Sequence, residues 1–157
     1  MAPASPNATL SEEITLLKSL TGLMKQEQAF LVSADTDGLN SLMQQKSQWI
    51  DHMARLAAQR HQLLAGAGCD AADSGMQAWL DKGKDSAAAA SWQQLLDLAR
   101  EAKELNRLNG MLINKQMSNN QALIDAMRVP AGAPETGFYG PSGQATVTSA
   151  TRKLVVG

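Results

Sequence analysis

The two histidines of this sequence are the main candidates for binding a metal ion. His52 and His61 are nine residues apart, which places them on opposite sides of a helix that turns by about 100° per residue. The di-metal sites of helical bundles need Glu-x-x-His pairs on facing helices, but Trp49 and Ala58 stand three residues before the two histidines. The sequence therefore predicts no metal site.

The sequence also gives little support for a catalytic nucleophile or for a phosphate-binding loop. Cys69 is the single cysteine, so no internal disulfide can form, and neither histidine is near it in the sequence to act as a base. The run DKGKDS at 81–86 resembles a phosphate loop only in its Gly-Lys pair. Such a loop needs a glycine at position 78 and Ser or Thr at position 85, where Ala and Asp stand. We predict that this protein is not an enzyme and binds no cofactor.

Composition narrows the classes of partner and compartment. A net charge of −1 and a pI near 6.1 predict no binding to nucleic acid. The sequence has no apolar run of the length that spans a bilayer, and its first residues lack the basic and apolar regions of a signal peptide. We therefore expect a cytoplasmic protein without direct membrane insertion, in a reducing compartment that suits the lone cysteine.

Heptad spacing of apolar residues predicts three long helices. The first begins near Thr9, where Thr9-Leu10-Ser11-Glu12 fits a capping box that satisfies free backbone amides. The second spans roughly residues 36–64 and the third roughly residues 86–128, with one or two helical turns at 76–80 between them. The expected fold is all-α: an elongated antiparallel bundle of three long helices over residues 1–128. A flexible or weakly structured C-terminal tail, rich in Pro and Gly, follows over residues 129–157.

In each predicted helix the apolar residues at heptad spacing form a row, or seam, along one side. Polar residues interrupt two of these seams. Lys46 and Arg60 in the second helix either pair with carboxylates of a partner helix or lay their stems over apolar surface while their heads reach water, and we favour the second interpretation. In the third helix the seam becomes polar from Asn109 onward, which indicates a surface that is not fully committed to the core. Eight methionines also suit a surface that repacks around different partner helices.

The stretch TGFYGPSGQATV at 136–147 places two of the six aromatic residues beside a Gly-Pro turn. Together with other segments it resembles the FlgN family of flagellar export chaperones. The resemblance rests on Lys46 with the later run AAQRHQLL, on LNRLNGMLI and NNQALIDAM, and on FYGPSG, which is similar to the family's Tyr-Gly-Pro-Asp-Gly turn. Ser142 stands where the family usually has an acidic residue, so no role is expected for a carboxylate there.

The resemblance implies a cytoplasmic chaperone for the hook–filament junction proteins FlgK and FlgL. Such a chaperone binds their C-terminal helical segments, prevents premature assembly and delivers them to the export gate protein FlhA at the inner membrane. We expect the junction proteins to bind along the second half of the third helix, through Leu112, Ile113, Gln116, Asn120, Leu123 and Met127. We expect the gate to bind the aromatic turn, Phe138, Tyr139, Gly140 and Pro141, although these aromatics could instead fold back over the bundle.

Two other classes of function stay open at this point. A structural coiled-coil or scaffold subunit with no export role would use the polar seam to set the register of its oligomer. An enzyme or small-ligand binder would need a concave pocket with converging polar groups.

Overall fold

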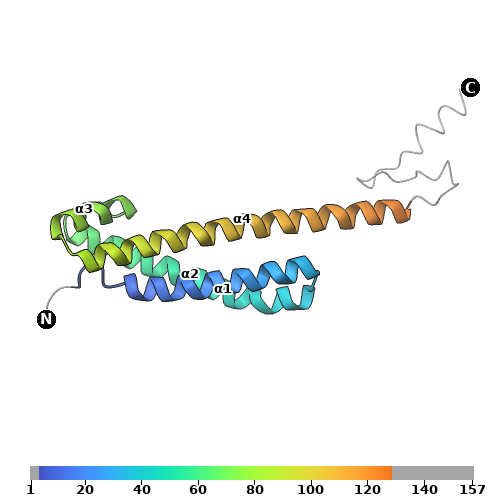
Figure 1. Cartoon of the computed structure of the whole chain (residues 1–157), viewed down its shortest axis with the longest axis horizontal. Coiled ribbons are helices and arrows are strands. Elements are labelled where there is room, and N and C mark those ends of the chain that lie inside the picture. Colours follow the sequence, from blue (N-terminus) through green and yellow to red (C-terminus); the bar gives the residue numbers. More distant parts are fainter. Residues whose placement is uncertain (1–3, 129–157) are drawn as a thin grey trace, which may run out of the picture. The chain divides into compact units, whose positions relative to one another are not determined.

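The computed structural model describes residues 4–128, which form four α-helices and, within that range, no strand (Figure 1). The helices are α1 (Leu10–Ser33), α2 (Thr36–Gly66), α3 (Asp73–Gly83) and α4 (Ser86–Arg128). The predicted all-α class is confirmed, and the three long helices begin and end close to the predicted residues. The predicted number of helices was wrong, because the segment expected to hold one or two turns forms a helix of 11 residues. The predicted tail at 129–157 lies outside the described residues.

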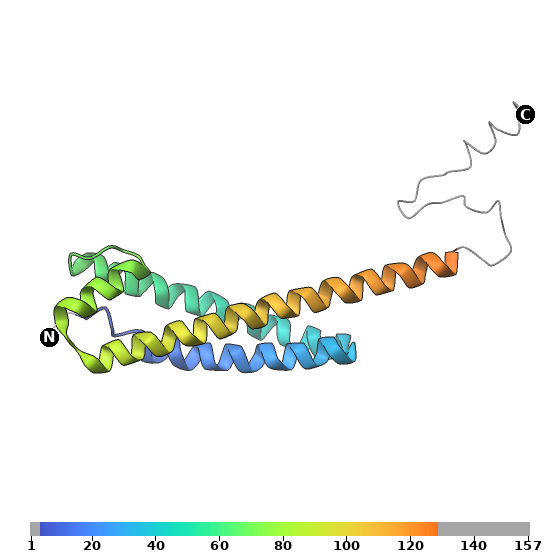
Figure 2. The same cartoon turned by 45° about the horizontal axis from the view of Figure 1, so that its top comes forward.

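The chain divides into two compact units, Met1–Leu112 and Ile113–Gly157. In the first unit α1 and α2 lie side by side and run in opposite directions, and the first part of α4 lies along them (Figures 1 and 2). A two-residue connection reverses the chain between α1 and α2: Ala34 adopts a left-handed backbone with φ of 56°, and the side chain of Asp35 accepts a hydrogen bond from the amide of Gly38. The short connection forces the two helices to be antiparallel neighbours.

The core of the first unit draws on all four helices. The heptad spacing of the first helix is confirmed, because Leu10, Ile14, Leu17, Thr21, Met24 and Leu31 recur at that spacing and are all buried. Helix α4 adds its own buried face. The buried core cluster consists of Leu10, Ile14, Leu17, Leu20, Met24, Leu64, Met76, Leu80, Ala88, Trp92, Leu95 and Ala102. Only three α2 residues are buried, Leu56, Arg60 and Leu64.

The start of α1 differs from the predicted capping box. Thr9 occupies the N-cap position, but its side chain makes no capping hydrogen bond. The Thr9 hydroxyl instead donates to Oε1 of Glu13 at 2.6 Å, and Glu12 lies 3.1 Å from Nε2 of His52 on α2. The reason is burial: Glu13 is 1% exposed, and a buried carboxylate is costly unless it accepts hydrogen bonds, one of which the Thr9 hydroxyl donates.

Helix α3 depends on close packing at its first turn. A Cβ atom added to Gly75 would lie 2.0 Å from the backbone oxygen of Asp70, so only glycine fits there. Met76 and Leu80 then insert into the core with 0% and 5% of their surface exposed. These contacts with residues distant in the sequence explain why spacing and propensity underestimated the length of α3.

Candidate protein-docking site

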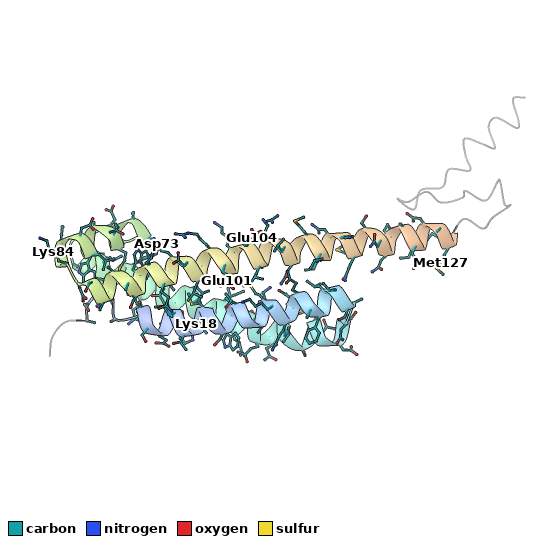
Figure 3. The ribbon with its side chains drawn as sticks, viewed as in Figure 1. Lys18, Asp73, Lys84, Glu101, Glu104 and Met127 are labelled. Carbon is teal, nitrogen blue, oxygen red and sulfur yellow. The ribbon has the colours of Figure 1, made fainter. Side chains whose placement is uncertain are left out.

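Arg60 of α2 is the centre of a buried polar cluster that joins all four helices. Its guanidinium donates to Glu13 of α1 at 3.0 and 3.2 Å and to Asp73 of α3 at 2.9 Å. Its Cζ atom lies 4.8 Å from the ring centre of Trp92 on α4, within the range of a cation–π contact. His61 lies beside Arg60 in the sequence, and its Nε2 is 3.0 Å from the same oxygen of Asp73. Asp73 lies in the first turn of α3 (Figure 3).

The hydrogen bonds of this cluster favour the charged forms of Arg60 and Asp73. Burial by itself would lower the pKa of Arg60, but its hydrogen bonds to Glu13 and Asp73 raise the pKa above the ordinary arginine value. Partial burial would likewise raise the pKa of Asp73, but the hydrogen bonds from His61 and Arg60 lower it. The paired charges therefore link α1, α2 and α3 at neutral pH.

A second polar layer lies further along the bundle, around Asn109 of α4. The Asn109 side-chain amide donates to the backbone oxygen of Met24 at 2.9 Å and to Oε2 of Glu27 at 2.8 Å. Glu27 also accepts from Lys46 of α2, whose Nζ lies 2.9 Å from both carboxylate oxygens. Asn109 is 2% exposed, so its amide is committed to the bundle interior.

These two layers correct two expectations from the sequence. Lys46 and Arg60 do not extend their heads into water, so the favoured interpretation was wrong. Both pair with carboxylates of α1, a helix of the same chain and not of a bound partner. Asn109 is not part of an exposed seam, because Glu27 and the Met24 carbonyl accept its hydrogen bonds. Polar residues at seam positions can specify register in helical bundles, and these three residues are each paired across helices at such positions.

Beyond Asn109 the character of α4 changes. Ile113 is 40% and Leu123 61% exposed, and Asn120 is also exposed. Met127, near the end of α4, is 75% exposed (Figure 3). Leu112 and Gln116, also predicted to bind a partner, are half-buried. Large apolar side chains exposed in a row are typical of a surface that binds another protein.

Two residues of this surface were missed by sequence reasoning. Met117 and Ile124 are 65% and 44% exposed, and they complete a row at alternating spacings of four and three with Ile113, Asn120 and Met127. The sequence already showed this spacing, because each residue of the exposed row lies one position after a residue of the seam that passes through Leu112. We call the α4 docking face the set Ile113, Met117, Asn120, Leu123, Ile124 and Met127.

The predicted gate-binding residues, Phe138, Tyr139, Gly140 and Pro141, lie outside the described residues. Of the methionines in the described range, Met24 and Met76 fill the core and Met53 packs half-buried against it, whereas Met43, Met111, Met117 and Met127 are exposed. Exposed, unbranched and polarizable side chains on α4 suit a surface that adapts to a partner.

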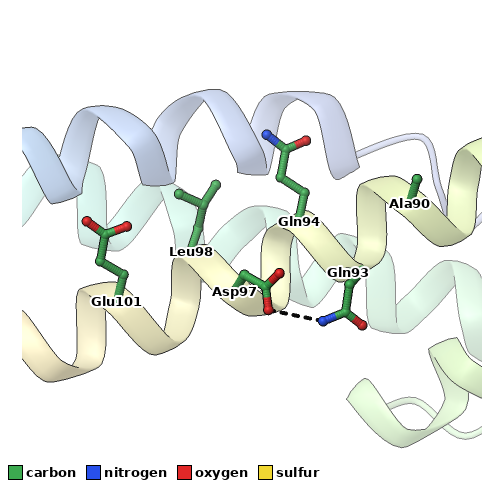
Figure 4. A pocket seen from close by; sticks show the side chains of 6 residues that line it. All are labelled: Ala90, Gln93, Gln94, Asp97, Leu98 and Glu101. Atoms are coloured by element: carbon green, nitrogen blue, oxygen red, sulfur yellow. Dashed lines mark hydrogen bonds between the residues drawn. The ribbon is translucent and has the colours of Figure 1, made fainter.

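Residues 4–128 show no arrangement of side chains typical of a metal site or of a small-ligand pocket. No three His, Cys, Asp or Glu side chains of that range could together hold a metal ion. An open pocket on α4 is lined by side chains of this helix alone (Figure 4). Its polar groups do not converge, because Gln93 donates to Asp97 at 3.0 Å and Glu101 pairs with Lys25 of α1 at 2.8 Å. It is therefore unlike a pocket that orients a small ligand.

None of the helices between residues 4 and 128 is long and apolar enough to cross a membrane.

Comparison with known proteins gives a consistent result. A model of the family described as FlgN protein matches residues 1–146. The flagella synthesis protein FlgN of Proteus mirabilis is 26% identical over 139 residues, which cover 87% of each chain. The protein of the same name from Yersinia enterocolitica is 27% identical over 138 residues, which cover 87% of this chain and 86% of the relative. No solved structure matches the chain.

Proposed function

Because the chain belongs to the FlgN family of flagellar synthesis proteins, we propose that it is a cytoplasmic export chaperone for the hook–filament junction proteins. It binds the C-terminal helical segments of FlgK- and FlgL-type proteins, keeps them from assembling prematurely and delivers them to an FlhA-type export gate. The family is not known as an enzyme family, which agrees with the expectation from the sequence.

The single observation that carries this proposal is the α4 docking face. Five of its six residues are large hydrophobic side chains with at least 40% of their surface exposed. An amphipathic cargo helix laid along this face would bury them, since helices recognise partner helices through side chains three and four positions apart.

The chemistry of the face also indicates the kind of cargo it binds. None of its six residues is charged, and the whole stretch 113–128 carries only Lys115, Asp125 and Arg128, which amount to one acidic and two basic side chains. Such a nearly neutral face gives little electrostatic steering. Recognition therefore depends on apolar side chains and on the Asn120 amide, which fits an amphipathic helix of low net charge.

A charge placed in the docking face tests cargo binding. We expect Leu123→Asp to weaken binding of purified FlgK and FlgL C-terminal segments by at least about 30-fold, the equivalent of about 2 kcal/mol for an interface hot spot. Ser118→Asp is the matched control, because Ser118 is exposed on the opposite side of the same helix. Isothermal titration calorimetry measures both. Normal binding by a folded Leu123→Asp protein would place the cargo site elsewhere.

We infer that delivery to the gate uses Phe138–Pro141, because FYGPSG is similar to the family's Tyr-Gly-Pro-Asp-Gly turn and lies within the residues that the family model matches. An aromatic pair beside a Gly-Pro sequence offers a large contact area at little cost in conformational entropy. We expect Tyr139→Ala to leave cargo affinity unchanged and to weaken binding to the FlhA cytoplasmic domain by about 2 kcal/mol or more. An equal loss of cargo binding would instead assign Tyr139 to the cargo site or the bundle, and unchanged gate affinity would remove its docking role.

A further inference from the structure

Glycine at position 110 of α4 has no explanation in packing. A Cβ atom added to Gly110 meets no atom within 4 Å, so the space around it would accept alanine. Glycine in the interior of a helix is less favourable than alanine, because it loses more backbone entropy when the helix forms. Gly110 therefore weakens the middle of α4 without improving any contact.

Asn109, the residue before Gly110, strengthens the attachment of α4 to the bundle. Asn109 fixes α4 to α1 through its hydrogen bonds to Met24 and Glu27, and Lys46 of α2 holds Glu27 in place. Immediately after these residues, the first compact unit ends at Leu112. Helix α4 thus has a residue bonded to α1, Asn109, directly followed by a residue of low helix propensity, Gly110.

The docking face begins directly after this pair. Ile113 lies four positions after Asn109, so the two side chains share one side of α4. Up to Asn109 this side is buried or half-buried in the bundle. Beyond it Ile113, Met117 and Asn120 are exposed, and Gln116 is half-buried. Any change in the direction of the helix axis at Gly110 would re-aim the whole docking face while the bundle keeps its packing.

We propose that α4 bends at Gly110, with the Asn109 layer as its fixed base, and that this hinge lets the docking face fit cargo helices of different sequence. Hinges are a few positions that absorb a change in backbone dihedral angles, and they are often small residues. The use of the hinge rests on the proposed chaperone function. The bending itself does not, so the two can be tested separately.

Distances between spin labels on α4 test the bending without any cargo. In a Cys69→Ser background, labels at Ala99→Cys and Ala122→Cys occupy exposed positions on either side of Gly110, about 35 Å apart along a straight helix. We expect a broad distance distribution from pulsed electron paramagnetic resonance for the chain with Gly110. Gly110→Ala should narrow the distribution and raise Tm by about 2–4 °C.

Gly22→Ala in α1 is the matched control, since a Cβ atom there also meets no atom within 4 Å. It should raise Tm by a similar amount and leave the α4 distances unchanged. Distributions of equal width with Gly110 and with Gly110→Ala would overturn the hinge, as would a narrowing that Gly22→Ala reproduces.

Binding of purified FlgK and FlgL C-terminal segments then tests the use of the hinge. We expect Gly110→Ala to lose at least about threefold in affinity for one of the two segments, while Gly22→Ala retains both affinities. Unchanged affinity for both segments would overturn the adaptive role of the hinge. If neither segment bound the protein with Gly110, the proposed function and the adaptive role would fail together, and the distance measurement would still decide the bending.

Discussion

The substitution Arg60→Met removes the cation that holds a buried carboxylate in the core. Glu13 is 1% exposed and would keep the hydroxyl of Thr9, 2.6 Å away, while it loses the guanidinium hydrogen bonds at 3.0 and 3.2 Å. Breaking a buried ion pair from one side costs about 3–5 kcal/mol. The Asp73 side chain is 64% exposed, so water replaces its lost partner and adds little to this value.

We therefore expect the free energy of unfolding at pH 7 to fall by about 3–5 kcal/mol, measured by urea titration followed by far-UV circular dichroism. The double variant Glu13→Met with Arg60→Met should recover most of the loss, because apolar residues of similar volume replace a buried pair at little cost. Arg100→Met is the control, since Arg100 forms an ion pair with Asp97 on the surface and should change stability by less than about 1 kcal/mol. A loss below about 1 kcal/mol for Arg60→Met, or a double variant as unstable as the sum of its single substitutions, would refute this account of the cluster.

Two further predictions concern α3. Gly75→Ala should destabilise the protein by about 1–3 kcal/mol despite the higher helix propensity of alanine, because its Cβ atom would meet the Asp70 backbone oxygen. Gly22→Ala, with open space around it, should stabilise by up to about 1 kcal/mol; thermal unfolding measures both, and a stabilising Gly75→Ala would contradict the packing at this turn. The lowered pKa of Asp73 contributes stability above its unfolded pKa of about 3.9, and this contribution is lost as the pH falls through the folded pKa. Asp73→Asn should therefore be less stable than the parent protein at pH 5–7, and the difference should shrink as the pH falls below the unfolded pKa and through the lower folded pKa. Parallel stability curves from pH 7 into this acidic range would count against the pairing.

Much of the fold was predictable, because the spacing of apolar residues and the turn residues between them predict where the helices begin and end. The heptad seam from Leu10 to Leu31 became the buried side of α1, and the turn residues at 33–38 became the connection to α2. The extent of α4 was also predicted from its spacing. These features depend on interactions between residues three or four positions apart, which a single sequence displays directly.

The tertiary structure alone decided which polar residues are buried. Arg60 and Asn109 interrupt apolar seams in the same way as Asn120, yet the first two are buried and bonded whereas Asn120 is exposed. Sequence spacing places each of them on a face of its helix, but it does not say whether another helix covers that face. The carboxylates of Glu13 and Glu27 make burial favourable at two of these positions, and they come from a different helix.

The same reason explains α3 and the docking face. The length of α3 depends on the approach of Gly75 to Asp70 and on the insertion of Met76 into a core built by distant residues. The docking face was predictable as a row of apolar and amide side chains, but its members changed once the exposed fractions of Met117 and Ile124 were known. Burial depends on contacts between residues far apart in the sequence, so local spacing determined the helices, and packing decided which of their faces remain open to a partner.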